Sequence, residues 1–318
     1  MTMSRHQRHK ELQLAQLRSF CLAATQGSFA EAAEAAGISR AAVWQQVRAL
    51  EGRLGLVLLR RRGRTVELTP DGRLVLDIVL PYVQGLESLD RLIETRQAET
   101  PPRLTLVAPP GQLAMALYKP LQLFASAHPN ARLSLLTELR ARQVERVVER
   151  GAADVGVLVS APDEPRSASL AYEPLFEVPL LLLTAADHPL ARKRRVTPQD
   201  LVAFPLILAP VGSIIRRGQD RLLRQYQVAA PLHVVMESEH THIVAQYVAI
   251  GLGIALWNMQ RWAVDLFPGL HGRVFDPSFD SLTAAMVVRK YAQQPEHVQE
   301  FCRIIRQYVA GKRPAEQS

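Results

Sequence analysis

Five side chains on one predicted helix have the chemistry to contact the bases of DNA. A helix beginning after Ser39 would turn its apolar residues inward and leave on the opposite face Arg40, Ala41, Trp44, Gln45 and Arg48. Arginine and glutamine can pair with purine edges in the major groove, and alanine or tryptophan can touch thymine methyl groups. The pattern predicts a base-reading surface, and we call these five residues the reading face.

An arginine-rich segment follows this helix. Between two short apolar runs stand Arg60, Arg61, Arg62 and Arg64. The flanking runs predict a β-hairpin whose tip carries the arginines toward phosphates or a narrow minor groove. The alternative is a charge run that meets only water. The density of arginine directly after the helix favours a contact with DNA.

Three short helices must position these groups. The apolar spacing from Leu14 predicts the first helix. Ser28 followed by Glu31 predicts a capping box at the start of the second, and Gly37 allows the tight turn before Ser39 caps the third. With the hairpin, this is a winged helix-turn-helix over residues 12–69, and Ser28 and Ser39 join the candidate DNA contacts.

The composition agrees with an acidic partner for this segment. The net charge is +8, and residues 1–69 hold eleven Lys and Arg against five Asp and Glu. Anionic membrane also fits the charge, but the helix geometry favours double-stranded DNA. No segment resembles a signal peptide or a membrane span, so we expect a cytoplasmic protein with no membrane partner. Cys21 and Cys302 are too few for a disulfide framework.

The run from Phe20 to Thr69 resembles the DNA-binding domain of LysR-type transcriptional regulators. The shared landmarks are Phe20, Gly27 to Phe29, Ala32 and Ala33, Leu50 and Glu51, Leu54 and Gly55, and Leu68 and Thr69. The resemblance implies a sequence-specific regulator of a pseudo-palindromic operator. The chain departs from the family at Trp44, which replaces a small hydroxylated residue, and at Arg40 and Ala41, which replace Gln-Pro. Trp44 either contacts the groove or packs against the second helix.

The rest of the chain predicts a linker helix and a two-lobed α/β domain. Apolar spacing over 70–98 predicts a long helix kinked at Pro81, and the resemblance implies that it pairs in a homodimer, with dimers joined into a homotetramer. Alternating strands and helices then predict parallel sheets, with one helix at 112–127 and one strand at 177–184. The resemblance implies a periplasmic-binding-protein-like effector domain at 103–312, with lobe I at about 103–174 and 276–312 and lobe II at about 175–275.

Three turns are expected to meet at the cleft between the lobes. They and their neighbours supply the candidate effector contacts, which are Pro109, Pro110, Gly111, Gln112, Arg140, Gly212, Ser213, Ser238 and Trp257. Ser213 and Ser238 stand at helix starts that favour an anionic group of a small-molecule effector, although ordinary capping also explains them. Trp257 either walls the pocket or fills the core.

Other functional classes fit less well. His240 and His242 are two residues apart and lie on different sides of a helix, so we expect no metal site. Gly251 and Gly253 lack the third glycine of a dinucleotide loop, and we expect no cofactor. An α/β enzyme would need catalytic groups that the turns do not offer. A solute-binding protein would leave the basic N-terminal segment without a role.

Overall fold

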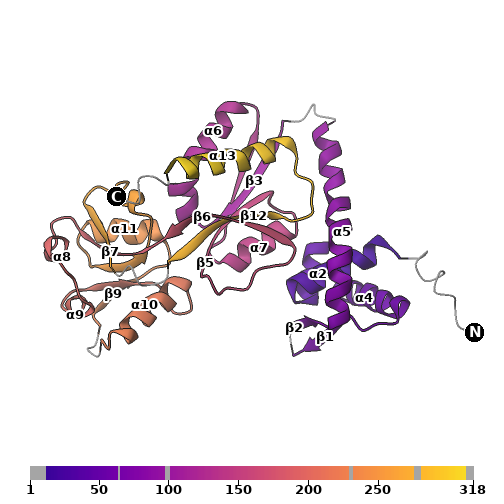
Figure 1. Ribbon diagram of the computed structural model, residues 1–318, viewed down its shortest axis with the longest axis horizontal. Coiled ribbons are helices and arrows are strands. Elements are labelled where there is room, and N and C mark those ends of the chain that lie inside the picture. Colours follow the sequence, from indigo (N-terminus) through magenta and orange to yellow (C-terminus); the bar gives the residue numbers. More distant parts are fainter. Residues whose placement is uncertain (1–11, 64, 97–100, 229–231, 276–280, 313–318) are drawn as a thin grey trace, which may run out of the picture.

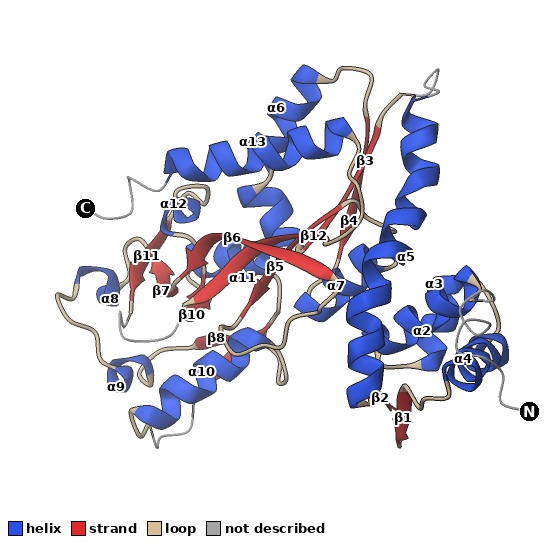
Figure 2. Ribbon diagram, turned by 45° about the vertical axis from the view of Figure 1, so that its right-hand side comes forward, coloured by secondary structure: helices blue, strands red, loops and turns tan. Residues whose placement is uncertain are grey.

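The computed structural model describes residues 12–63, 65–96, 101–228, 232–275 and 281–312. An N-terminal head is joined by one long helix to two α/β lobes (Figure 1). Figure 2 shows that the lower part of this helix packs within the head while its upper part runs beside the first lobe. The arrangement brings segments far apart in sequence into contact.

The head is a winged helix-turn-helix. Its elements are α2 (Leu14–Gln26), α3 (Phe29–Ala36), α4 (Arg40–Leu54), β1 (Leu59–Arg62) and β2 (Thr65–Leu68). Each helix ends at a left-handed glycine, Gly27, Gly37 or Gly55, a conformation in which glycine carries no steric penalty. The head core holds Phe20, Ala32, Val43, Val47, Leu50 and Leu58.

Two local predictions for the head were wrong in detail. Ser28 Oγ accepts hydrogen bonds from the N–H groups of Ala30 and Glu31, but the Glu31 carboxylate does not complete a capping box, because it pairs with Arg146. In the wing, Arg60–Arg62 lie within β1 and not in the turn, since Arg62 is paired with Thr65 across the ladder. The arginines therefore lie along one strand.

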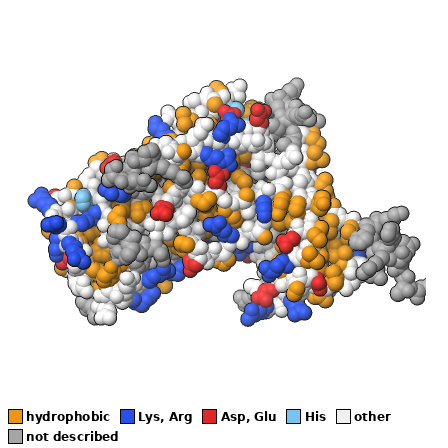
Figure 3. All heavy atoms as spheres, viewed as in Figure 1, with side chains coloured by type: hydrophobic (Ala, Val, Ile, Leu, Met, Phe, Trp, Pro, Cys, Tyr) orange, Lys and Arg blue, Asp and Glu red, His pale blue; other side chains and the backbone are white. Residues whose placement is uncertain are grey.

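The linker helix α5 spans Pro70–Arg96 and continues through Pro81. Its start is tied to the head, because Thr69 N–H donates to Leu58 O at 3.0 Å and Thr69 Oγ1 accepts from Gly72 N–H at 2.9 Å. Six exposed apolar side chains form a stripe along it, Leu74, Ile78, Tyr82, Leu86, Leu89 and Ile93. Figure 3 shows hydrophobic side chains gathered along this helix.

Lobe I is a five-stranded sheet in the order β4-β3-β5-β12-β6. Its strands are β3 (Arg103–Ala108), β4 (Arg132–Thr137), β5 (Val155–Ser160), β6 (Leu170–Val178) and β12 (Leu282–Arg289). One face is covered by α6 (Tyr118–Ala127) and α13 (Glu296–Lys312) and the other by α7 (Ala141–Glu149). α7 lies on the side of the lobe that meets the head, because Arg146 and Arg150 pair with glutamates of α3.

Lobe II contains a three-stranded sheet, β10-β7-β11, and a parallel pair, β8 and β9. The strands are β7 (Leu180–Ala185), β8 (Leu206–Leu208), β9 (Val234–Glu237), β10 (Ala255–Asn258) and β11 (Leu270–Val274). The helices are α8 (Pro189–Arg192), α9 (Pro198–Leu201), α10 (Ile214–Gln225), α11 (Thr241–Ala249) and α12 (Arg261–Val264). α11 and α12 pack on one side of the sheet, and α10 packs on the other.

Three predictions for the lobes were wrong. The sheet of lobe I is mixed, because β12 returns from lobe II antiparallel to β5 and β6. The three-stranded sheet of lobe II is antiparallel, because β10 and β11 both pair antiparallel with β7. The predicted helix at 112–127 is split into a π-helical turn, Gln112–Ala116, and α6, since a helix running unbroken through Pro120 would bring its ring against the carbonyl of Ala116. The predicted strand at 177–184 is split at Pro179, so β6 stays in lobe I through Val178, past the boundary expected at 174.

Both cysteines lie in cores. Burial raises the pKa of the Cys21 thiol to about 12 and that of Cys302 to about 11, so neither forms a thiolate near neutral pH. Within the described ranges, no helix is long and apolar enough to cross a membrane.

Candidate nucleic-acid interface and effector cavity

The reading face is exposed in full on α4. Arg40, Ala41, Trp44, Gln45 and Arg48 are all exposed, while Val43, Val47 and Leu50 on the opposite side are buried. Ser39 Oγ accepts a hydrogen bond from Ala42 N–H at 3.1 Å and so fixes where the helix begins. The face therefore belongs to a capped, anchored helix, which suits it to a groove.

Glu51 joins this helix to the wing. Its Oε1 accepts from Leu58 N–H at 2.8 Å and from Leu59 N–H at 3.1 Å. Its Oε2 lies 2.8 Å from Arg48 Nη1. One buried carboxylate therefore holds the start of β1 and one side chain of the reading face.

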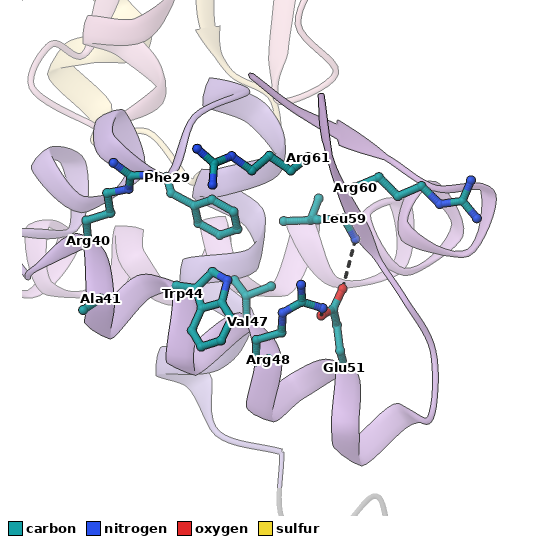
Figure 4. A pocket seen from close by; sticks show the side chains of 10 residues that line it. All are labelled: Phe29, Arg40, Ala41, Trp44, Val47, Arg48, Glu51, Leu59, Arg60 and Arg61. Carbon is teal, nitrogen blue, oxygen red and sulfur yellow. Dashed lines mark hydrogen bonds and ion pairs between the residues drawn. The ribbon is translucent and has the colours of Figure 1, made fainter. Parts of the chain in front are cut away.

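The reading face and the wing enclose a shared hollow of about 580 Å³. Its walls come from α3, α4 and β1, with Phe29, Trp44, Leu59 and Arg61 among them. In Figure 4 Arg61 extends over the hollow, whereas Arg60 extends in the opposite direction. The structure therefore brings the predicted helix face to one surface with Arg60 and Arg61, the two wing arginines that line the hollow.

Trp44 remains available for contact. Its side chain is 48% exposed, and the Arg48 guanidinium lies 5.4 Å from its ring centroid. Phe29 of α3 lines the same hollow. The surface on which Trp44 could contact a DNA groove is therefore also the surface on which it could pack against the second helix. Of the other candidates, Ser28 and Ser39 cap their helices, Arg62 Nη1 lies 3.2 Å from Glu67 Oε1, and Arg64 lies outside the described residues.

A second cavity, which we call the junction cavity, lies where the head meets both lobes. Its volume is about 670 Å³, within the usual range for a small-molecule site. The head supplies Thr25 and Leu76, lobe I supplies Leu139 and Tyr172, and lobe II supplies Ile214. Charged side chains on its walls are Arg140, Arg142, Arg166 and Arg217 against Glu145, Glu164 and Glu239. The walls therefore combine apolar surface with a net positive charge.

The predicted effector residues divide into two groups. Arg140, Gly212 and Ser213 line this cavity, and Ser213 Oγ also caps α10 by accepting from Arg216 N–H at 3.1 Å. The cavity walls do not include Pro109, Pro110, Gly111, Gln112 or Ser238. Trp257 fills the core of lobe II, fully buried, with its Nε1 donating to Thr241 Oγ1 at 3.1 Å. It therefore does not wall this cavity.

The turn after β3 still faces lobe II. A Cβ on Gly111 would lie 3.5 Å from Thr241 Cβ, so the two lobes meet closely there. Gln112 Oε1, His240 Nδ1 and His242 Nδ1 are buried with no hydrogen-bond partner among the described residues. Ser238 Oγ accepts from His240 N–H at 3.2 Å. The residues described include no group of three His, Cys, Asp or Glu arranged to hold a metal ion.

Sequence patterns missed a buried polar cluster beside the cavity. Burial raises the pKa of Glu149, although Arg142 opposes this shift. The hydroxyls of Ser167 and Ser169 donate to its carboxylate. Burial also raises the pKa of Tyr172, whose hydroxyl donates to Glu145 Oε1 at 2.6 Å. No local motif marks these residues, because they come from α7, from the loop before β6 and from β6, and they meet only when lobe I folds.

Comparison with known proteins assigns both parts of the chain. Residues 14–73 match the bacterial regulatory helix-turn-helix of the lysR family, and residues 97–310 match the LysR substrate binding domain. The chain belongs to the LysR family. This LysR-family chain is therefore a DNA-binding transcriptional regulator with a substrate-binding effector domain, as the resemblance implied, and its homologues are regulators and not enzymes.

The sequences of known regulators match this LysR-family regulator along most of its length. The SDS degradation transcriptional activation protein of a Pseudomonas strain is 36% identical over 220 residues, 67% of this chain and 70% of that protein. The transcriptional regulator CbbR of Rhodospirillum rubrum is 26% identical over 266 residues, 82% of this chain and 85% of that protein. A full-length OxyR variant from Pseudomonas aeruginosa matches at a TM-score of 0.54 and 20% identity, over 94% of this chain and 95% of that one, which shows a common fold.

Proposed function

We propose that this regulator binds a pseudo-palindromic operator in double-stranded DNA through the reading face and the wing. The observation that carries the proposal is the exposed reading face of α4, set beside a strand that holds Arg60, Arg61 and Arg62. Arg40, Gln45 and Arg48 would pair with base edges, and the wing arginines would contact phosphates. Cytoplasmic localisation follows from this partner.

The operator symmetry is proposed from the linker helix. The apolar stripe on α5 runs from Leu74 to Ile93 and lies on the outside of the described chain. A second copy of α5 would cover this stripe, and a two-fold pair of heads would meet two inverted half-sites. Pairs of such dimers would form the homotetramer.

The experiment for the DNA proposal is selection of binding sites from random duplexes by the purified protein. The expected outcome is one inverted-repeat motif, bound with an affinity that falls steeply as salt rises. Recovery of unrelated sequences with no shared motif would contradict the proposal. Residues 12–69 without α5 are not a suitable control, because Thr69 and Gly72 bind the start of α5 to the head.

We propose further that the junction cavity takes a small organic anion as the effector. Its four arginines outnumber its three glutamates, and its leucine and isoleucine walls suit an apolar body. Two helix starts, those of α7 and α10, open toward it at Arg140 and Ser213 and add partial positive charge. The effector would thus carry a carboxylate or sulfonate on an apolar frame.

A fluorescent sulfonate with an apolar frame, 8-anilinonaphthalene-1-sulfonate, provides the probe for this cavity. We expect saturable binding to one site per chain, weakened about tenfold in Arg140→Ala, which removes a cation from the cavity wall. Arg132→Ala, on the exposed edge strand β4, is the matched control. Equal binding by wild type and Arg140→Ala would contradict the placement of the anion.

A further inference from the structure

The head is held against lobe I by one stripe of α7. Arg142, Arg146 and Arg150 recur every four residues and so share one side of the helix. Arg146 Nη1 lies 3.0 Å from Glu31 Oε1, and Arg150 Nη1 lies 3.4 Å from Glu34 Oε1. These two glutamates are three residues apart on α3, so two helices meet with complementary charge.

The other end of the contact is buried. Arg142 Nη2 donates to the backbone carbonyl of Thr25, and Gln26 Nε2 donates to Glu149 Oε2 at 3.0 Å. Gln26 and Glu149 are each 6% exposed. Separating the head from α7 would return these groups to water and break hydrogen bonds made in a region of low dielectric constant. The contact is therefore specific in its geometry.

The end of the contact that Arg146 and Glu31 form is weaker, although both side chains are only partly exposed. Arg146 Nε and Glu31 Oε2 are buried and, within the described part of the chain, have no hydrogen-bond partner. An ion pair with unsatisfied atoms contributes little net free energy to the contact, because the desolvation cost of both charges opposes their attraction. The contact therefore combines a defined geometry with an interaction that can be broken and formed again.

The linker helix is tied to the same part of lobe I. Gln84 Nε2 donates to Ser169 O at 3.0 Å, and Gln84 Oε1 accepts from Tyr291 N–H at 2.9 Å. Ser169 also donates to Glu149, so the loop before β6 contacts both α5 and the buried end of the head contact. The head is thus fixed at two places, on its linker and on α7.

This contact leaves the reading face free. The reading face lies on α4, whereas the contacts with α7 come from the end of α2 and from α3. Lobe I contributes no residue to the hollow between the reading face and the wing. The contact of the head with α7 therefore leaves the reading face open to a DNA groove. It also sets the direction in which the reading face points.

We propose that this α7 stripe is an intrachain latch that sets the direction of the reading face and thereby the half-site spacing that a dimer accepts. The latch consists of Thr25, Gln26, Glu31 and Glu34 on the head with Arg142, Arg146, Glu149 and Arg150 on lobe I. The inference rests on the proposed function, and deepens it by naming its regulation. Thr25 and Arg142 also line the junction cavity, so an anion bound there and the head share one guanidinium.

The test uses the full chain and the operator motif recovered by selection. The spacing between the operator half-sites is increased or decreased by one base pair, which rotates one half-site about the axis of the DNA duplex. The affinity of the protein is then measured for each duplex. For the wild type we expect about a tenfold loss at each altered spacing. Arg146→Glu, which places a carboxylate against Glu31, is expected to reduce that loss to about threefold or less.

The paired charge reversal separates the latch from general damage. Glu31→Arg combined with Arg146→Glu restores opposite charges and is expected to restore the wild-type spacing preference. Arg132→Glu makes the same charge change on β4, away from the latch residues, and is expected to keep the wild-type profile. If Arg146→Glu does not fold, the equivalent exchange of Glu34 and Arg150 is used.

Two results would overturn the latch. One is an unchanged spacing preference in folded Arg146→Glu, and the other is a double variant that stays as tolerant as the single one. Failure of the proposed function gives a different result, since the wild type would then recover no operator motif and no spacing series could be measured.

Discussion

Arg48 of the reading face lies 2.8 Å from Glu51, the residue whose other carboxylate oxygen anchors the wing. The base-contacting helix and the phosphate-contacting strand are therefore connected through one buried side chain. Arg48 is half exposed, and the Glu51 side chain is 6% exposed. Binding of DNA by Arg48 would act directly on the residue that positions the arginines of β1.

Replacement of Glu51 measures the strength of this connection. Glu51→Ala leaves the N–H groups of Leu58 and Leu59 without their acceptor in a buried position. We expect a loss of about 2–4 kcal/mol in the free energy of unfolding, measured by urea denaturation. Glu51→Gln keeps one acceptor oxygen and should lose less. Equal losses in the two variants would show that the hydrogen bonds to the wing contribute little.

Gly72 tests how the linker helix meets the head. A Cβ at this position would lie 2.0 Å from Leu58 O, a backbone atom that cannot move aside without disturbing the wing. Gly72→Ala should therefore destabilise the head by about 1–3 kcal/mol. Gly52→Ala on α4 is the control, because nothing lies within 4 Å of a Cβ there and alanine favours a helix. Thermal unfolding should show opposite shifts for the two variants.

Arg61 tests the role of the wing through salt. Its guanidinium lies over the hollow beside the reading face, where a phosphate contact would release counterions (Figure 4). Arg61→Ala should weaken operator binding and lower the slope of log affinity against log salt by about 1. Its base preference should stay that of the wild type. An unchanged slope would mean that Arg61 contacts no phosphate.

Glu149 gives the latch region a pH dependence with a defined sign. Burial raises the pKa of its carboxyl above the usual 4.5, with Glu145 adding to the shift and Arg142 opposing it. Between the usual and the raised pKa the folded chain binds the extra proton, so stability falls as pH rises through this window. Glu149→Gln should flatten that fall in urea unfolding curves measured across mildly acidic pH. A wild-type curve identical to that of Glu149→Gln would contradict the shift.

Local patterns predicted the head well because its signals are local. Ser39, Gly37 and Gly55 mark helix ends through groups within a few residues, and the side chains facing inward repeat at the helical period. The wing differs from its prediction in one respect, which is that β1 continues through Arg62. The π-helical break before α6 also has a local signal in the sequence, which is Pro120.

The contacts between domains had no comparable signal. Gln26 and Glu149 are 123 residues apart, and their hydrogen bond depends on which surfaces of two domains meet. The antiparallel return of β12 likewise depends on a strand that comes back from lobe II. For the same reason, the structure brings only some of the predicted effector residues to one site. Arg140 and Ser213 line the junction cavity, whereas Trp257 lies in the core of lobe II.

Operator selection repeated with Arg40→Ala beside the wild type decides whether the reading face contacts bases. If the reading face contacts bases, the variant should lose preference at one or two base pairs in each half-site, worth about 1–3 kcal/mol, and keep the others. A uniform loss of affinity with the same base preference at every position would contradict the assignment of base reading to this face of α4.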